Sequence, residues 1–287
     1  MPTFDALARA HEVALVVAQP DKRAGRGLKL QSPAIAIRAR ELGLPLAQPP
    51  KIREAFEDVA AAKPEIAIVV AYGKILPAPL LKVPPRGFLN VHASILPKYR
   101  GAAPIQRAIE HGETETGVTI MRVDEELDHG PILSIARTAI GADERSSQLA
   151  QRLARLGAEE MIRTLNRIDD IAETPQDHAR TTYAPKIEKF EGEIRWSDPA
   201  ATIYNKFRAF DPWPGVFRED LKLIEIERVA GGGQRAGTIL SIDSEGVTVA
   251  TGVGAIRLIT LQRAGKARQR AVDFARGAGW RVGEQLE

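Results

Sequence analysis

Short apolar runs alternate with helical patterns through the first half of this 287-residue chain. The runs at residues 13–18, 65–72 and 88–91 are almost continuously apolar, as is usual for strands of a parallel sheet that is covered on both faces. A helical pattern lies between the first two of them, at residues 33–42. The alternation continues to residue 143 and predicts an α/β domain built on a parallel sheet.

The pattern changes after a long helical stretch at residues 145–171, in which Gly157 predicts a kink. Residues 173–198 lose periodicity and contain Pro175, Pro185 and Gly192, with Pro199 directly after them, which indicates a connecting segment. Closely spaced β-rich runs separated by glycine turns then predict a small barrel. We therefore predict domains at residues 1–172 and 199–287, joined by a linker at 173–198. The β-rich runs are residues 216–218, 221–229, 237–242, 246–250 and 255–261.

Composition excludes several classes of protein. The chain has no cysteine, so it has neither a disulfide framework nor a thiolate nucleophile. No apolar run reaches the roughly 18 residues of a membrane span, and charged residues interrupt the first dozen positions, unlike a signal peptide. The 5 histidines have no metal-ligand spacing. We expect a cytoplasmic monomer without a metal or a membrane partner.

The most informative stretch covers residues 87–106. Asn90 and His92 lie two apart on an apolar strand, so their side chains share a face near its carboxyl end. Asp128 lies in a polar loop between two further apolar runs, and it reaches His92 if those strands are neighbours of the first. A single polar residue at a strand end is more often a satisfied structural group. An amide, an imidazole and a carboxylate together can polarise a carbonyl and move protons, which predicts a catalytic site.

Several motifs, found in one order, resemble the folate-dependent formyltransferase family. They span nearly the whole chain and read NVHASILPKYRGAAPIQRAI, TGVTIMRVDEELDHGPIL, VVAQPDKRAGRGLKLQSP, VVAYGKILP, TYAPKIEKFEG, RAFDPWPG and LQRAGK. The resemblance implies a Rossmann-like formyltransferase domain followed by an oligonucleotide-binding (OB)-type β-barrel. It also implies transfer of the formyl group of 10-formyltetrahydrofolate, the co-substrate, to the amino group of initiator methionyl-tRNA.

The resemblance also assigns roles to individual residues. Asn90 and His92 would donate hydrogen bonds to the formyl oxygen, while Asp128 would favour the imidazolium of His92 and relay a proton. Ser94 is not expected to be a nucleophile, because a serine two residues from His92 in a turn has poor geometry for a triad. Tyr72 and Gly73 would help to form the wall of the folate pocket, although a simple strand exit explains these two residues equally well. The expected folate contacts are Ser94, Ile95, Leu96, Pro97, Tyr72 and Gly73.

Basic residues in two segments are expected to contact the phosphates of the transfer RNA. One segment is the loop at residues 19–32, and the other directly follows the last strand of the predicted barrel. A merely solvated basic surface is the alternative explanation for both segments. The residues are Arg23, Arg26, Lys29, Arg263, Lys266 and Arg268.

Two features depart from the family pattern. His129 stands where a small hydroxyl residue is more usual, and its ring could compete for the carboxylate of Asp128. The strand and glycine-bearing turn that open related chains are missing, so we expect this chain to be short at its amino end. Two alternatives stay open. One is formylation of another amine, such as an amino sugar nucleotide or a purine precursor, and the other is a truncated, inactive RNA-binding protein.

Overall fold

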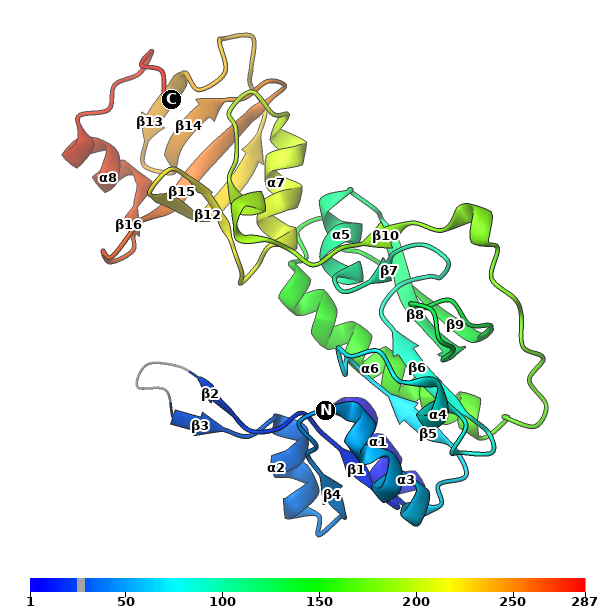
Figure 1. The fold of residues 1–287 in the computed structure, drawn as a ribbon. Coiled ribbons are helices and arrows are strands. Elements are labelled where there is room, and N and C mark those ends of the chain that lie inside the picture. The colour runs from blue at the N-terminus through cyan, green and yellow to red at the C-terminus, as the bar shows by residue number, and fades with distance from the viewer. Residues whose placement is uncertain (25–28, 287) are drawn as a thin grey trace. The chain divides into compact units, whose positions relative to one another are not determined.

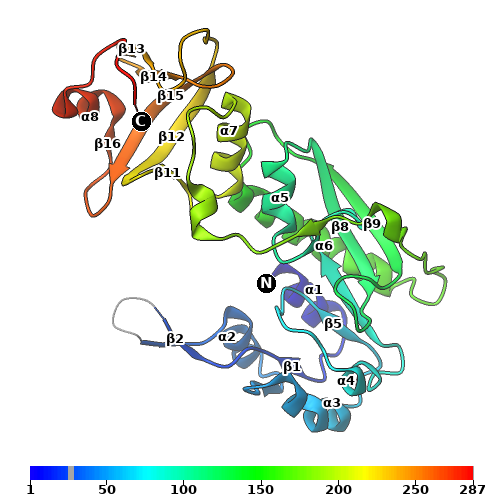
Figure 2. The same cartoon turned by 45° about the horizontal axis from the view of Figure 1, so that its top comes forward.

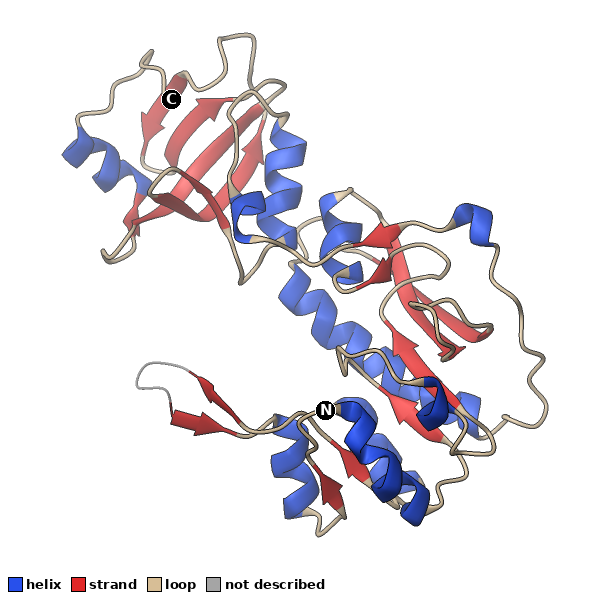
Figure 3. Cartoon of the chain, viewed as in Figure 1, coloured by secondary structure: helices blue, strands red, loops and turns tan. Residues whose placement is uncertain are grey.

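The computed structural model describes residues 1–24 and 29–286, and their contacts divide the chain into two compact units (Figures 1 and 3). Each unit draws on segments that are separate in the sequence. The first consists of Met1–Pro104, Glu115–Ala139 and Ala150–Ala184, and the second of Ile105–Thr114, Ile140–Leu149 and Pro185–Glu287.

The main sheet of the first unit has four strands in the order β5-β6-β8-β9. β5 (Ala67–Val69) and β6 (Phe88–His92) are parallel, whereas β8 (Glu115–Arg122) and β9 (Ile132–Ala139) each run antiparallel to the preceding strand in this order. The predicted parallel arrangement is therefore confirmed for β5 and β6 and wrong for β8 and β9. The loop between β8 and β9 is too short for the crossover that parallel neighbours need, so these strands form a hairpin.

A second, smaller sheet pairs β1 (Val16–Val17) with β4 (Leu46–Ala47) in parallel. Both β1 and β5 are much shorter than the apolar runs that predict them, and each has one strand partner among the described residues. No ladder joins β1 to β5 in this part of the chain. The expectation about the amino end stays a prediction.

The basic segment at residues 19–32 was expected to be a loop, but it contains an antiparallel hairpin. β2 (Lys22–Ala24) pairs with β3 (Lys29–Gln31), so that Lys22 is opposite Gln31. The segment has no apolar alternation, so its sequence carries no strand signal. Arg26, one of the expected RNA contacts, lies outside the described residues.

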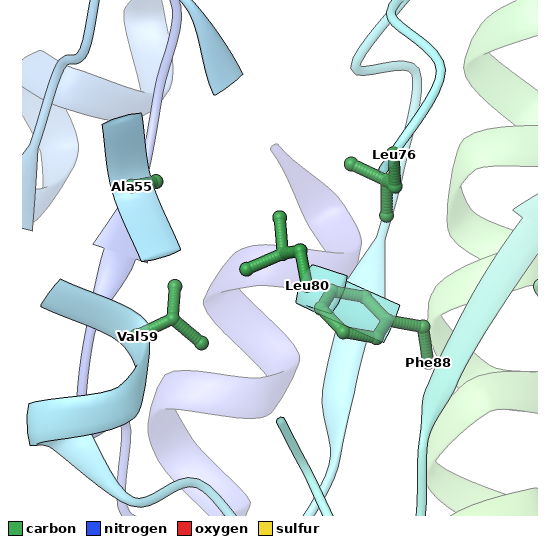
Figure 4. Packing of buried hydrophobic residues seen from close by; sticks show 5 residues of the cluster. All are labelled: Ala55, Val59, Leu76, Leu80 and Phe88. Carbon is green, nitrogen blue, oxygen red and sulfur yellow. The ribbon is translucent and has the colours of Figure 1, made fainter. Parts of the chain in front are cut away.

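Apolar side chains from three segments form a core cluster beside β6. Figure 4 shows Ala55 and Val59 facing Leu76, Leu80 and Phe88, and all five side chains are buried. The helical elements of the chain up to the end of this unit are α1 (Pro2–Ala10), α2 (Ala34–Glu41), η1 (Ile52–Ala55), α3 (Phe56–Ala62), α4 (Ala78–Leu81), α5 (Pro104–Glu110), α6 (Ser146–Leu165) and η2 (His178–Arg180).

The long helix α6 packs on the sheet at Gly157. A Cβ atom at this position would lie 2.7 Å from Cγ1 of Val91 and 3.3 Å from Cγ1 of Val118, which is too close for the first of these contacts. The glycine therefore lets the helix approach β6 and β8, and α6 continues as one helix through this residue. Close packing against β6 and β8 accounts for the glycine, and the kink predicted from Gly157 stays a prediction.

The second unit contains an antiparallel sheet in the order β11-β12-β15-β14-β13, with β16 paired to β15. α7 packs on β12 and β15, while α8 packs on β14 and β15 (Figure 2). β14 is buried along its whole length, which makes it the centre of this core. The elements are η3 (Lys189–Gly192), α7 (Ala200–Ala209), β11 (Val216–Arg218), β12 (Leu221–Val229), β13 (Ile239–Asp243), β14 (Gly246–Ala250), β15 (Ala255–Arg263), β16 (Gln269–Arg270) and α8 (Ala271–Ala278).

Five of these strands overlap the five β-rich runs of the sequence, and three of them have the predicted bounds. The ladders between described residues join them into an open path, so a closed barrel is not shown. Within residues 1–24 and 29–286, no helix combines the length and the apolar character that a membrane crossing requires.

Candidate active site

Three side chains converge at the carboxyl end of β6. Asn90 Nδ2 donates a hydrogen bond to Oδ1 of Asp128 at 3.3 Å, and Nδ1 of His92 lies 3.6 Å from Oδ2 of the same carboxylate. Alternation along β6, expected from the sequence, puts Asn90 and His92 on one face. The loop that carries Asp128 leaves β8 beside Phe88, at the amino end of β6, and Asp128 reaches both side chains from that loop.

Asp128 is held in a strained but well-defined position. Its backbone has a φ of +49°, in the left-handed region that non-glycine residues rarely occupy outside functional sites. The backbone N–H of Gly101 donates to Oδ2 of Asp128 at 2.9 Å. Gly101 itself has a φ of +116°, and a Cβ there would lie 2.9 Å from the carbonyl oxygen of Ala184. The donor therefore depends on a glycine where β7 (Arg100–Gly101) pairs with β10 (Tyr183–Ala184).

The His92 ring is buried and has a defined tautomer. Its Nε2 lies 2.8 Å from the carbonyl oxygen of Tyr99. A carbonyl only accepts hydrogen bonds, so Nε2 carries a proton. Nδ1, which faces Asp128, then carries a proton only in the imidazolium form. His92 can therefore donate a hydrogen bond to a substrate oxygen through Nδ1 once the ring is protonated.

The loop after β6 is fastened to β8 by hydrogen bonds. Oγ of the buried Ser94 donates to the carbonyl of Lys98 at 2.6 Å, and the Ser94 carbonyl accepts a bond from Thr119 Oγ1 at 2.7 Å. The Ser94 hydroxyl is thus used within its own loop. Leu96 is also buried, whereas Ile95 and Pro97 are half-buried. Of the four expected folate contacts in this loop, only Ile95 and Pro97 therefore expose part of their side chains. Contact with folate stays a prediction for all four.

Tyr72 and Gly73 follow β5. The Tyr72 ring packs against the core cluster, and its carbonyl accepts a hydrogen bond from Gln19 Nε2 at 3.0 Å. Its hydroxyl is buried without a hydrogen-bond partner among the described residues, and burial raises the pKa of Tyr72. Gly73 is exposed and has a φ of +72°. These features fit a strand exit, and a folate contact here stays a prediction.

His129 does not compete for the carboxylate of Asp128. Its Nδ1 lies 2.7 Å from Oδ2 of Asp124, and its ring stacks on the ring of His178 with centroids 4.2 Å apart. Both partners draw the His129 ring away from Asp128. The competition expected from the sequence is therefore wrong.

The described basic residues from both segments are exposed. Arg23 and Lys29 lie on the β2–β3 hairpin of the first unit. The Asp21 carboxylate, at the base of this hairpin, accepts hydrogen bonds from Ser32 and Gln48. These bonds, chiefly the one from Ser32, lower the pKa of Asp21. The residues of the second unit that were expected to contact RNA are Arg263, Lys266 and Arg268, and all three are exposed.

Arg263 has partners of its own. Its Nε lies 3.2 Å from Oδ2 of Asp220, and its guanidinium lies 5.3 Å from the centroid of the Phe274 ring. These contacts hold Arg263 against its own unit. Contact with RNA by any of the basic residues stays a prediction.

Sequence reasoning missed a contact from the expected linker. Gln176 is buried, and its side-chain amide donates to the backbone carbonyls of Asp128 and Gly130. No periodicity marks this residue, because it lies in an irregular segment of the first unit. Its contacts with Asp128 and Gly130 can be recognised only from the three-dimensional position of the loop between β8 and β9.

The site is identified by its convergent side chains. One cavity of about 600 Å³ lies against α6 and β9, and another of about 710 Å³ lies in the second unit beside α7 and β12. Neither is lined by Asn90, His92 or Asp128. Within the part of the chain that the structure describes, no group of three or more histidine, aspartate or glutamate side chains could hold a metal ion.

Known families and proteins are similar to this chain over most of its length. The Formyl transferase family matches residues 5–165, and the family described as Formyl transferase, C-terminal domain, matches residues 186–279. A methionyl-tRNA formyltransferase from Thermus thermophilus is 42% identical over 292 residues, covering 100% of this chain and 95% of the relative. A methionyl-tRNA formyltransferase from Deinococcus radiodurans is 42% identical over 294 residues, covering 100% and 92%.

Solved structures share the fold at low sequence identity. An N-formyltransferase from Helicobacter canadensis, solved with folinic acid and dTDP-3-aminofucose, has a TM-score of 0.69 and 18% identity, covering 89% of this chain and 93% of that one. HypX from Aquifex aeolicus, solved with tetrahydrofolic acid, has a TM-score of 0.60 and 20% identity. The likeness covers 83% of this chain and 43% of HypX.

Proposed function

This chain belongs to the formyl transferase family, and from that premise we propose that it transfers the formyl group of 10-formyltetrahydrofolate to the amino group of initiator methionyl-tRNA. The product is N-formylmethionyl-tRNA for translation initiation. The observation that carries the proposal is the meeting of Asn90, His92 and Asp128 at one point of β6. Relatives named methionyl-tRNA formyltransferase, which match the chain from end to end, support the choice of acceptor.

Asn90 and His92 stabilise the charge that develops during transfer. The amine nitrogen bonds to the formyl carbon, and negative charge grows on the formyl oxygen. Asn90 has two amide protons, of which one is directed to Asp128, so the other is available to that oxygen. His92 supplies a second donor through Nδ1 when it is protonated. A preorganised donor of this kind stabilises a transition state by about 3 to 4 kcal/mol.

Asp128 moves the proton. The attacking amine becomes an ammonium once the new C–N bond has formed, and it must lose a proton. The bond between the formyl carbon and the folate nitrogen then breaks, and that nitrogen gains a proton. Asp128, fixed by Gly101 and Asn90, accepts the first proton and delivers the second, directly or through water.

We assign the chemistry and the RNA contacts to different parts of the chain. Residues 1–172 carry the reaction, residues 173–198 are the linker, and residues 199–287 form an OB-type barrel that binds the transfer RNA. The matched ranges 5–165 and 186–279 support this division. Folate lies along Ile95 and Pro97, with Ser94, Leu96, Tyr72 and Gly73 shaping its surroundings. We further propose that the protein acts as a cytoplasmic monomer.

An assay of acceptor amines tests the proposal. Purified protein is given 10-formyltetrahydrofolate and either methionyl initiator tRNA, an amino sugar nucleotide, or an aminated purine precursor, and formyl products are measured. Turnover with the charged tRNA alone is the expected result. Turnover with a small amine instead would assign the site to another member of the family. RNA binding without any turnover would indicate an inactive RNA-binding form.

Removing positive charge from the hairpin is expected to weaken RNA binding without changing the chemistry. In Arg23→Ala/Lys29→Ala, the KM for methionyl-tRNA rises, while kcat at saturating tRNA and the KM for folate stay at wild-type values. The slope of log affinity against log salt concentration falls by about two, since each lost phosphate contact contributes about 0.9. Fluorescence titration at several salt concentrations measures this slope.

Lys82→Ala is the matched control, since Lys82 is an exposed cation of the same unit outside the hairpin. Its salt slope should equal that of the wild type. Equal slopes for the wild type and the hairpin variant would show that Arg23 and Lys29 make no contact with the phosphates of the RNA.

A further inference from the structure

Gln176 connects the linker segment to the loop that carries Asp128. Its Nε2 donates to the backbone carbonyl of Asp128 at 2.9 Å and to that of Gly130 at 2.7 Å. The residue is 6% exposed, so water does not replace these bonds easily. One side-chain amide thus spans the residues on both sides of His129 and fixes the backbone at the point where Asp128 has its positive φ.

The other end of the Gln176 amide is fixed by Arg100. Oε1 of Gln176 accepts hydrogen bonds from Nε of Arg100 at 3.2 Å and from Nη2 at 2.7 Å. All four hydrogen-bonding positions of the glutamine amide are therefore used. Arg100 is 4% exposed and directly precedes Gly101, whose N–H donates to the Asp128 carboxylate. The same short strand therefore holds Asp128 twice, once by its backbone and once through Gln176.

A second contact runs parallel to the first. Nη2 of Arg100 also donates to Nδ1 of His178 at 2.9 Å, and the His178 ring stacks on His129 with an interplanar angle of 1°. Arg100 therefore supports the loop of Asp128 through two side chains. Gln176 bonds the backbone of the loop, and His178 stacks on the ring of His129. Three segments far apart in the sequence, at residues 100–101, 128–130 and 176–178, form one closed network.

We propose that Gln176, held by Arg100, is a positioning residue that sets the catalytic carboxylate of Asp128 against Asn90 and His92. The left-handed backbone at Asp128 is strained, and it persists because the surrounding hydrogen bonds hold it. Gln176 supplies two of those bonds. The proposal rests on the formyl-transfer function described above, and it extends the site from β6 to residues 176–178 of the same unit.

The test replaces Gln176 with two residues that cannot donate the bonds. Gln176→Glu keeps the shape and can still accept from Arg100, and Gln176→Met keeps the length without charge. Both are expected to lower kcat about 10- to 100-fold, since a shift of about 1 Å in a catalytic group can cost about 100-fold. The KM values for both substrates should stay within about threefold of wild type. A purely structural defect would reduce the amount of folded enzyme without this split.

A double variant separates action through Asp128 from an independent effect. If Gln176 acts through Asp128, adding Gln176→Glu to Asp128→Asn causes no further loss of kcat. A loss equal to the product of the two single losses overturns the proposal, as does wild-type kcat in both Gln176 variants. Loss of folded structure in both variants, seen by circular dichroism, also overturns it, since Gln176 then serves stability.

Gln285→Glu is the matched control, because the Gln285 amide also donates to a backbone carbonyl, that of Ala236. It should retain wild-type kcat. The outcomes distinguish this inference from the function beneath it. A wild-type protein that does not formylate methionyl-tRNA contradicts the proposed function, whereas an active wild type with unaffected Gln176 variants contradicts only the positioning role.

Discussion

Asp128→Asn is expected to lower kcat by about 1,000-fold, within the range of roughly 100- to 10,000-fold that a positioned proton-transfer group contributes. The asparagine oxygen can still accept the hydrogen bond from Gly101, so the loop should keep its structure. What is lost is a group that takes a proton from the attacking amine. Single-turnover measurements with saturating tRNA and 10-formyltetrahydrofolate report this loss.

Binding of both substrates should survive the Asp128→Asn substitution. Filter binding of methionyl-tRNA and fluorescence titration of folate are expected to give wild-type affinities. The neighbouring residue offers a control, because His129 contacts Asp124 and His178 and turns away from Asp128. His129→Thr should keep the wild-type kcat and an unchanged pH–rate profile. Full activity of Asp128→Asn would remove the carboxylate from the mechanism.

Asn90→Ala is expected to lower kcat by about 100- to 1,000-fold, as removal of one preorganised donor to a developing oxyanion does. Asn90 is half-buried on β6, and its loss leaves the strand pairing intact because the backbone makes those bonds. The KM for folate should change little, since the donor acts mainly on the charge of the transition state. Steady-state kinetics with each substrate varied in turn measures the split.

Asn166→Ala serves as the comparison for this substitution, since Asn166 is an exposed asparagine directly after α6 in the same unit. It should retain wild-type kinetics. A rise in KM without a fall in kcat for Asn90→Ala would show that Asn90 binds the ground state of the substrate. The amide would then have no special contact with the transition state.

The three side chains of the site could be predicted from the sequence because simple geometry determines their placement. The two-residue period of a strand puts Asn90 and His92 on one face. A short polar loop between two apolar runs brings Asp128 to these side chains, provided that the runs lie beside the first strand, as β8 does. The first step needs only a local rule, whereas the second needs a contact between distant segments, which the family resemblance supported.

Other features could not be read from the sequence. A buried strand is apolar whichever way it runs, so the pattern could not show that β8 and β9 are antiparallel. The direction of the His129 ring depends on Asp124 and on His178, which lies in a different segment. Gln176 has no pattern around it, and its role depends on where Arg100 and the Asp128 loop meet. In each case a contact between distant segments decides the outcome.

The glycine in the middle of α6 links a remote helix to the reacting groups. Val91, which touches Gly157, stands between Asn90 and His92 and faces away from them, because neighbouring strand residues point to opposite sides. A methyl group at position 157 would clash with Val91, on the face of β6 opposite to the one that carries Asn90 and His92. The positions of both donors therefore depend on apolar packing behind the strand. A substitution in that packing would lower the rate of the reaction even though no reacting group had changed.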